Sequence, residues 1–173
     1  AASIRFNRHD NSELIYQNSG RLYVLDLDSM SGSLIPEAKA GSGYLVKGDE
    51  VYSLQKTADS ALLQVIDKDD GRIEHSVSLP YADYEFLYPD RELITLFDRA
   101  HRIIYIVDPF SAIKPIRETL GNAAHMEWNG AGRLFYTDNY EIWQLNLATS
   151  NKDLLTRISD PVAKLAYHPS GRH

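Results

Sequence analysis

Two acidic segments are the first candidates for chemistry in this sequence, because closely spaced carboxylates are the ligands that calcium prefers. They are Asp67–Gly71, which reads Asp-Lys-Asp-Asp-Gly, and Asp26–Asp28, which reads Asp-Leu-Asp. Neither segment has the full calcium-loop pattern with its closing glutamate. An Asp-Gly pair is also typical of a tight hairpin turn. We therefore predict simple turns at these segments and no cofactor, with a bound cation as the alternative.

Histidines are the candidate ligands for a transition metal, and they are scattered along the chain. The six are His9, His75, His101, His125, His168 and His173. No two of them stand at i, i+2 or i, i+4, and the chain has no cysteine, so the spacing of a zinc site is missing. His125 opens a predicted strand, and we expect it to line a loop or a channel. We predict no metal site.

Serine, histidine and aspartate are all present, but the patterns that would turn them into a catalytic site are not. The Gly-x-Ser-x-Gly turn of many hydrolases is missing, and Gly41-Ser42-Gly43 lacks its spacing. Phosphate-binding glycine loops are missing as well, since Gly121–Ala124 and Gly130–Gly132 fit simple turns better. We therefore predict no catalytic residue and no enzymatic activity.

The composition narrows the range of partners. The chain has 173 residues, of which 43% are hydrophobic and 24% charged, as expected for a soluble globular protein. Its 18 basic and 24 acidic residues give a net charge of −6, so a broad cationic surface for phosphates is not expected. Apolar runs such as Ile103–Val107 are far shorter than the roughly 20 residues that span a bilayer. We expect a protein or peptide partner, no nucleic acid and no membrane insertion.

A repeat of about forty residues organises the elements that must position any site. Its anchors are short segments in which an aromatic or apolar residue is followed by polar turn residues. They begin at positions 6, 46, 88, 128 and 167, at spacings of 40, 42, 40 and 39 residues. The segments are Phe6–Ser12, Val46–Glu50, Tyr88–Glu92, Trp128–Arg133 and Tyr167–Arg172. Such regularity indicates a repeat architecture.

Each repeat predicts four short strands. After the anchor come a strand-like run, a polar turn, a longer apolar run and a more polar stretch. The longer apolar runs are 21–27, 61–67, 103–107 and 141–147. Four strands every forty residues are typical of a β-propeller blade, because neighbouring blades cover both faces of each sheet. A β-sandwich or barrel is the alternative.

At these residues the sequence resembles the WD-repeat-like propellers of the TolB-like type. Their inner strand ends in aromatic-Ser-Pro-Asp-Gly-Lys/Arg, which Tyr167–Arg172 and Trp128–Arg133 match in outline. A second similarity lies at Tyr23–Gly32, which resembles the end of the third strand in those propellers. The likeness covers nearly all of the chain. It implies an all-β propeller module, and it also suggests the extracytoplasmic sensor part of a bacterial regulator.

The repeat gives the expected boundaries. We predict four blades over approximately 2–41, 42–81, 82–122 and 123–161, and the start of a fifth at 162–173. In that fifth repeat Val162–Tyr167 is the expected inner strand. Because Ser3–Asn7 already supplies the inner strand of the first blade, we expect a segment of a longer propeller. Alternatively, a second copy covers the open blade edge, since uncovered strand edges favour pairing.

Loops at one end of a propeller converge on its channel, and they carry the candidate partner-binding residues. These loops join the second strand to the third and one blade to the next. The predicted binding residues are Asp59, Asp98, Arg99, His101, His125, Asp138, Asn139 and Tyr140, and the same loops carry Asn18, Tyr81, Asp83 and Asn122. Mixed polar and aromatic side chains suit a peptide or a protein loop. The alternative is an ordinary solvated loop surface.

Taken together, these features predict a non-catalytic interaction or sensing module. The fold-level analogy supports a rigid surface with loops for contact. The alternatives are an accessory propeller of a hydrolase or peptidase and an extracytoplasmic sensor domain.

Overall fold

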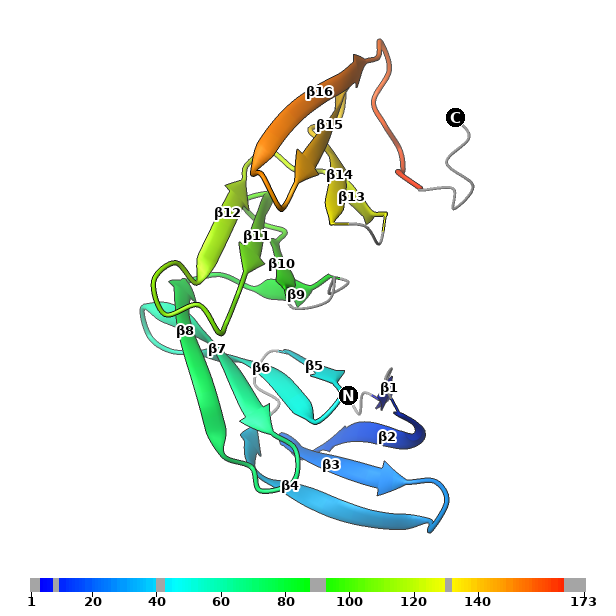
Figure 1. Ribbon diagram of the computed structural model, residues 1–173, viewed down its shortest axis with the longest axis vertical. Helices are drawn as coiled ribbons and strands as arrows, with labels where there is room; N and C mark the ends of the chain where they lie inside the picture. Colours follow the sequence, from blue (N-terminus) through cyan, green and yellow to red (C-terminus); the bar gives the residue numbers. More distant parts are fainter. Residues whose placement is uncertain (1–3, 8–9, 40–42, 88–92, 130–131, 167–173) are drawn as a thin grey trace. The chain divides into compact units, whose positions relative to one another are not determined.

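The computed structural model describes residues 4–7, 10–39, 43–87, 93–129 and 132–166. Within these residues the regular secondary structure consists of sixteen β-strands, and there is no helix. The strands form four sheets of four, and each sheet contains four strands that follow one another in the sequence (Figure 1). The prediction of an all-β chain with four four-stranded sheets is confirmed.

The strand bounds follow the repeat. The first sheet contains β1 (Ile4–Asn7), β2 (Asp10–Asn18), β3 (Arg21–Asp26) and β4 (Ser31–Lys39). The second contains β5 (Gly43–Lys47), β6 (Glu50–Lys56), β7 (Ser60–Asp67) and β8 (Ile73–Pro80). The third contains β9 (Tyr84–Phe86), β10 (Ile94–Asp98), β11 (Ile103–Val107) and β12 (Ile116–Leu120). The fourth contains β13 (His125–Trp128), β14 (Arg133–Thr137), β15 (Glu141–Asn146) and β16 (Asn151–Arg157).

Burial follows a strand's place in its sheet. The residues Val51–Leu54 of β6 are buried in succession, as are Ile104–Val107 of β11. Continuous burial is expected where both faces of a sheet are covered. The fourth strand of each sheet lies at its edge, and every residue of β16 is exposed. The middle strands therefore supply much of the core, and the edge strand β5 adds the buried residues Tyr44, Leu45 and Val46 to it.

The chain forms two compact units, and each is described by itself. The first consists of Ala1–Phe86 and Pro109–Pro115, and the second of Leu87–Asp108 and Ile116–His173. Within the first unit the loop residue Phe110 packs edge-on against His75, with ring centroids 4.8 Å apart.

The first unit is held by an apolar cluster between two sheets. The cluster consists of Ile15, Leu22, Val24 and Ile35 from the first sheet and Tyr44, Val46, Val51 and Ile66 from the second. The hydroxyl of Tyr44 also donates a hydrogen bond to the carbonyl of Ile15, at 3.3 Å. The turn after β7 approaches β4 so closely that a Cβ on Gly71 would overlap the backbone of Pro36. Because Gly71 also has a φ of +73°, the turn requires glycine for two reasons.

The second unit has a matching cluster between the third and fourth sheets. It consists of Ile104, Ile106 and Leu120, Ala123 from the link between the sheets, and Leu134, Tyr136 and Leu145. Trp128 and Trp143 pack against it and are partly buried. Burying each large apolar side chain contributes about 1.5–3 kcal/mol. The apolar runs of the repeat thus become the contact between neighbouring sheets.

The strand expected at Val162–Tyr167 is not formed over its described part. Residues 161–166 are outside the strands, although the N–H of Val162 donates to the carbonyl of Asn139 at 2.6 Å. A strand needs a neighbouring strand for its backbone groups, and within the described ranges none pairs with these residues. The anchor Tyr88–Glu92 and the final segment Tyr167–His173 lie outside the described residues.

Candidate interaction site

One surface of the second unit brings three loops together. We call it the Arg102 rim and define it as residues 98–102, 121–125 and 138–140. The guanidinium of Arg102 donates to the carbonyls of Asn122 at 2.9 Å, Ala123 at 3.4 Å and Asp138 at 3.3 Å. In return the N–H of Ala123 donates to the carbonyl of Arg102 at 2.8 Å. One side chain thereby joins two strand-connecting turns to the link between their sheets.

The buried side chain of Asp98 holds the first of these turns in place. Its side chain is only 3% exposed, and its carboxylate accepts a hydrogen bond from the backbone N–H of His101 at 3.1 Å. The other carboxylate oxygen lies 2.6 Å from Nδ1 of the His101 ring. Since a carboxylate only accepts, Nδ1 carries the hydrogen. Asp98 therefore positions His101, whose side chain is 66% exposed, and does not itself face solvent.

The second turn is capped in a similar way. Asp138 accepts hydrogen bonds from the N–H groups of Tyr140 at 3.2 Å and Glu141 at 3.0 Å. The hydroxyl of Thr137 accepts one from the N–H of Asn139 at 3.1 Å, and Asn139 has a φ of 109°. These caps hold the backbone of a short turn without sheet pairing. Tyr140, at 49% exposed, is presented from a fixed backbone.

The structure places seven of the eight predicted binding residues on the Arg102 rim. These are Asp98, Arg99, His101, His125, Asp138, Asn139 and Tyr140. The guanidinium of Arg99 lies 5.7 Å from the centre of the Phe97 ring, and Arg99 is exposed. The eighth, Asp59, is exposed in the first unit and belongs to another turn. Arg102 was not predicted from the sequence. The sequence feature that could have indicated it is a basic residue directly before the third strand of its repeat.

The corresponding loops of the first unit are joined by an ion pair. Lys56, at the end of β6, pairs with Asp83, and its ammonium lies 5.2 Å from the centre of the Tyr81 ring. The hydrogen bond to Asp83 raises the pKa of Lys56 above its usual value. The turn that carries Asp59 is closed by Thr57, whose hydroxyl accepts from the N–H of Ser60 at 3.0 Å. Asp83 and Tyr81 thus lie beside the end of β6.

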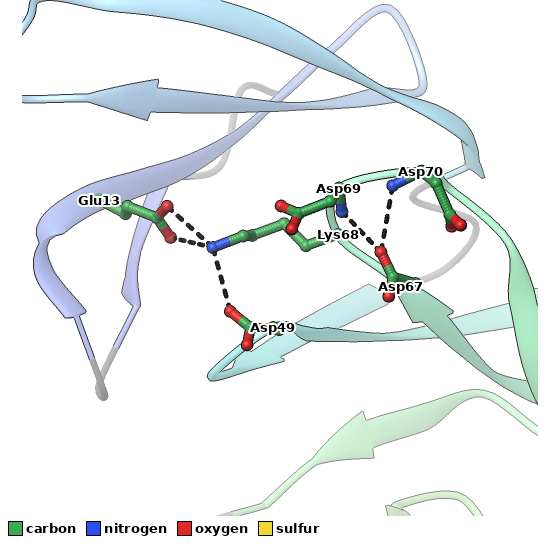
Figure 2. Close-up of polar contacts among 6 residues, drawn as sticks. All are labelled: Glu13, Asp49, Asp67, Lys68, Asp69 and Asp70. Atoms are coloured by element: carbon green, nitrogen blue, oxygen red, sulfur yellow. Dashed lines mark hydrogen bonds and ion pairs between the residues drawn. The ribbon is translucent and has the colours of Figure 1, made fainter.

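The acidic segment after β7 is a turn, with a lysine among the carboxylates (Figure 2). One oxygen of Asp67 accepts from the N–H groups of Asp69 at 2.8 Å and Asp70 at 3.1 Å. Lys68 donates to both carboxylate oxygens of Glu13, at 2.8 and 2.6 Å, and its ammonium lies 3.6 Å from Asp49 (Figure 2). The turn interpretation therefore accounts for these residues without a bound cation.

Neighbouring charges and hydrogen bonds shift the pKa values of Lys68 and Asp67 in this cluster. Burial lowers the pKa of Lys68, but the hydrogen bond and charge of Glu13, with the charges of Asp49 and Asp69, outweigh it and raise the pKa above its usual value. Hydrogen bonds from the backbone N–H groups of Asp70 and Asp69 lower the pKa of Asp67. Over the described residues, no group of three or more His, Asp or Glu side chains could hold a metal ion. Lys68 is the internal counter-ion of Glu13.

The described residues also contain no helix long and apolar enough to cross a membrane.

Comparisons with known proteins identify the fold. No protein-family model matches the sequence, and no curated protein matches it. Among solved structures, Hsv2 of Kluyveromyces lactis has a TM-score of 0.66 at 18% identity, over 98% of this chain and 54% of that chain. The β-propeller domain of Cps50 (Swd1) from Myceliophteria thermophila has a TM-score of 0.63 at 12% identity, over 96% and 62%. A chain of the mitotic checkpoint complex has a TM-score of 0.62 at 15% identity, over 94% and 52%.

These solved structures are WD40-like β-propellers, and the chain therefore has the fold of part of such a propeller. Its four sheets are propeller blades, and it spans between 52% and 62% of the three solved chains above. The resemblance to WD-repeat-like propellers is confirmed, and the narrower TolB-like relationship stays a prediction. The expected homodimer and the expected lack of nucleic-acid binding also stay predictions.

Proposed function

We propose that the chain is a non-catalytic module that binds a protein or peptide partner through the Arg102 rim. The accessory-domain and sensor alternatives use the same kind of surface and differ in what is attached to it. Protein and peptide partners fit better than nucleic acid because the chain carries a net charge of −6.

The observation that supports this proposal is the way Arg102 fixes three loops that carry exposed side chains. A loop that is ordered before binding loses less conformational entropy on binding than a mobile one. Arg102 reaches three backbone carbonyls across two sheets, and Asp98 and Asp138 cap the turns on either side. Aromatic and arginine side chains dominate binding energy at protein interfaces.

The site also combines exposed side chains for contact with a buried side chain that orients one of them, as a recognition surface needs. Arg99, His101 and Tyr140 are exposed, whereas the carboxylate that orients His101 is buried. Changing the exposed side chains therefore removes contacts without removing the caps that shape the turns.

The test is a selection of displayed random peptides on the purified 173-residue chain. We expect peptides that bind the wild-type chain and lose binding to the triple variant Arg99→Ala, His101→Ala and Tyr140→Ala. The matched control replaces Arg72, Glu74 and Ile73, which are exposed on the first unit, with alanine and should keep binding. Near-identical thermal unfolding of the variants shows that they are folded. Binding that survives in the triple variant would refute the proposal.

A further inference from the structure

We infer that His101 recognises the partner through its second ring nitrogen, Nε2, which accepts a hydrogen bond from an N–H or O–H group of the bound segment. This inference rests on the proposed function and names the chemistry of one contact within it. It starts from the pair that His101 forms with Asp98. One carboxylate oxygen of Asp98 lies 2.6 Å from Nδ1 of the ring, and the side chain of Asp98 is 3% exposed whereas that of His101 is 66% exposed.

The contact between Asp98 and the histidine ring is additional to what the turn requires. The other carboxylate oxygen of Asp98 closes the first turn, because it accepts from the N–H of His101, three residues on, at 3.1 Å. Asp138 closes the second turn at the same spacing, and one of its oxygens accepts from the N–H of Glu141 at 3.0 Å. One carboxylate oxygen is therefore enough for such a turn, and Asp98 uses its second oxygen to hold the ring of His101.

This hydrogen bond decides the role of each ring nitrogen. A neutral imidazole has one N–H and one acceptor nitrogen, and the bond made by one nitrogen sets the role of the other. Because the carboxylate of Asp98 accepts at Nδ1, the hydrogen is on Nδ1, and Nε2 of the neutral ring keeps its lone pair. Among the described residues the ring of His101 makes no further hydrogen bond. Nε2 is thus available to a partner as an acceptor.

A fixed acceptor discriminates between groups of the partner. A backbone N–H, a hydroxyl or a side-chain amide N–H can donate to Nε2. A carbonyl or carboxylate oxygen at the same place meets a lone pair and loses its hydrogen bonds to water, which makes the contact unfavourable. Since Asp98 already holds the ring, little side-chain entropy is lost when the contact forms. Asp98 is then a positioning residue, and His101 makes the contact.

The first measurement uses the free 173-residue chain and needs no partner. Ring nitrogen-15 chemical shifts distinguish a protonated nitrogen from an acceptor nitrogen, and His101→Gln identifies the signals of His101 by their loss. We expect the Nδ1–H tautomer at His101 once the ring is neutral, in spectra recorded from pH 7 to pH 9. Asp98→Asn should shift the ring toward the Nε2–H tautomer, because an asparagine oxygen can still close the turn while its amide donates to Nδ1.

The second measurement uses a selected peptide whose binding is lost in the triple variant, at a pH where the ring is neutral. His101→Asn keeps an amide near the position of Nδ1 and removes the acceptor, whereas His101→Gln places an amide oxygen near the position of Nε2. We expect His101→Asn to weaken binding about tenfold, as for the loss of one hydrogen bond, and His101→Gln to retain most of the affinity. Asp98→Asn should weaken binding although the exposed ring remains.

The donor on the peptide is found by replacing its hydroxyl and amide side chains with alanine and by methylating its backbone nitrogens one at a time. Removal of the correct donor should weaken binding to the wild-type chain and have no further effect on His101→Asn, as expected for two groups that bind each other. Variants are compared only after their unfolding transitions match that of the wild type. The His101 variants change an exposed side chain and keep the test available if Asp98→Asn does not fold.

The outcomes separate this inference from the proposed function. An Nε2–H tautomer at His101, or a ring that stays protonated on both nitrogens up to pH 9, would overturn the inference whatever the rim binds. Equal affinities of His101→Asn and His101→Gln would also overturn it, while peptide binding at the rim still stands. If no selected peptide depends on Arg99, His101 and Tyr140, the proposed function fails and the recognition role of Nε2 fails with it, even where the expected tautomer is observed.

Discussion

The two units of the chain join their blades with the same kinds of polar contact in different emphasis. In the first unit a largely buried ion pair joins Lys68 to Glu13, and the Tyr44 hydroxyl donates to the carbonyl of Ile15. In the second unit the ion pair, between Lys152 and Glu118 at 3.2 Å, is more exposed, and the side chain of Arg102 donates to three backbone carbonyls. Both units add an apolar cluster between their sheets.

The difference separates two sources of stability. An ion pair depends on the identity and charge of both partners, so it is sensitive to pH and to substitution at either end. A hydrogen bond to a carbonyl depends on one side chain only, because every residue supplies the same acceptor. The second unit can therefore vary its loop side chains while keeping its rim in place, which is what a binding surface requires.

The largest effect is expected in the apolar clusters. Leu134→Ala in the second unit and Ile66→Ala in the first remove fully buried side chains, and each should lower the free energy of unfolding by about 2–5 kcal/mol. The two tryptophans, Trp128 and Trp143, both lie in the second unit. Urea unfolding followed by tryptophan fluorescence therefore reports on that unit, and circular dichroism reports on both. A cost well below 1 kcal/mol in either variant would contradict the assigned core.

Removing the ion pair between Lys68 and Glu13 should have the next largest effect. Lys68→Met leaves Glu13, which is 16% exposed, without its counter-ion, and should cost about 2–3 kcal/mol. The double variant with Glu13→Gln should recover much of this loss, because no unpaired charge is left. Urea unfolding by circular dichroism measures both. If the double variant is no more stable than Lys68→Met, the ion pair is not the source of the effect.

In the second unit, Arg102→Lys should cost about 1–2 kcal/mol. A lysine ammonium lacks the planar fork that reaches several carbonyls at once. The loss should be visible by tryptophan fluorescence. Arg133→Lys, an exposed arginine on β14, is the control and should change stability by less than about 0.5 kcal/mol. Equal costs for the two variants would contradict the role given to Arg102.

The smallest effect is expected from alkaline pH. The pKa of Lys68 is raised in the folded state, so the folded chain holds this proton more tightly than the unfolded chain. Its contribution is complete below the unfolded pKa of about 10.4 and is lost as pH rises through the folded pKa. The free energy of unfolding should therefore fall above about pH 10. Buried Tyr52 and Tyr136 also have raised pKa values and act in the same direction.

Lys68→Met isolates the lysine from the tyrosines. Its alkaline loss should be smaller than that of the wild type, because Lys68 no longer titrates and only Lys56 and the two tyrosines keep raised pKa values. Urea unfolding at several pH values between 7 and 11 gives the comparison. Identical pH profiles for the two chains would show that Lys68 does not contribute.

The strands and turns could be predicted from the sequence, because they depend on residues that are close together in the chain. Runs of β-formers at a regular spacing gave the strands, and the Asp-Gly pair after β7 gave its turn. Contacts between blades could not be predicted from the sequence, because they join residues far apart in the chain. Lys68 and Glu13 are 55 positions apart, and Arg102 and Asp138 are 36 apart.

Two further differences have the same cause. Asp98 was predicted as a contact residue, but its carboxylate is directed inward to His101, which only the turn geometry reveals. The strand predicted at Val162–Tyr167 has suitable residues, yet its described part has no strand beside it to pair with. Residue types indicate what a segment can form, and the surrounding structure determines whether it does.

The most direct test of the binding surface is amide chemical-shift mapping of the chain with a peptide taken from the selection. We expect the largest shifts to fall on residues 98–102, 121–125 and 138–140, and we expect the Arg102→Lys variant to bind the same peptide more weakly. Shifts that instead centre on the first unit, around Asp49 and Asp69, would contradict this expectation.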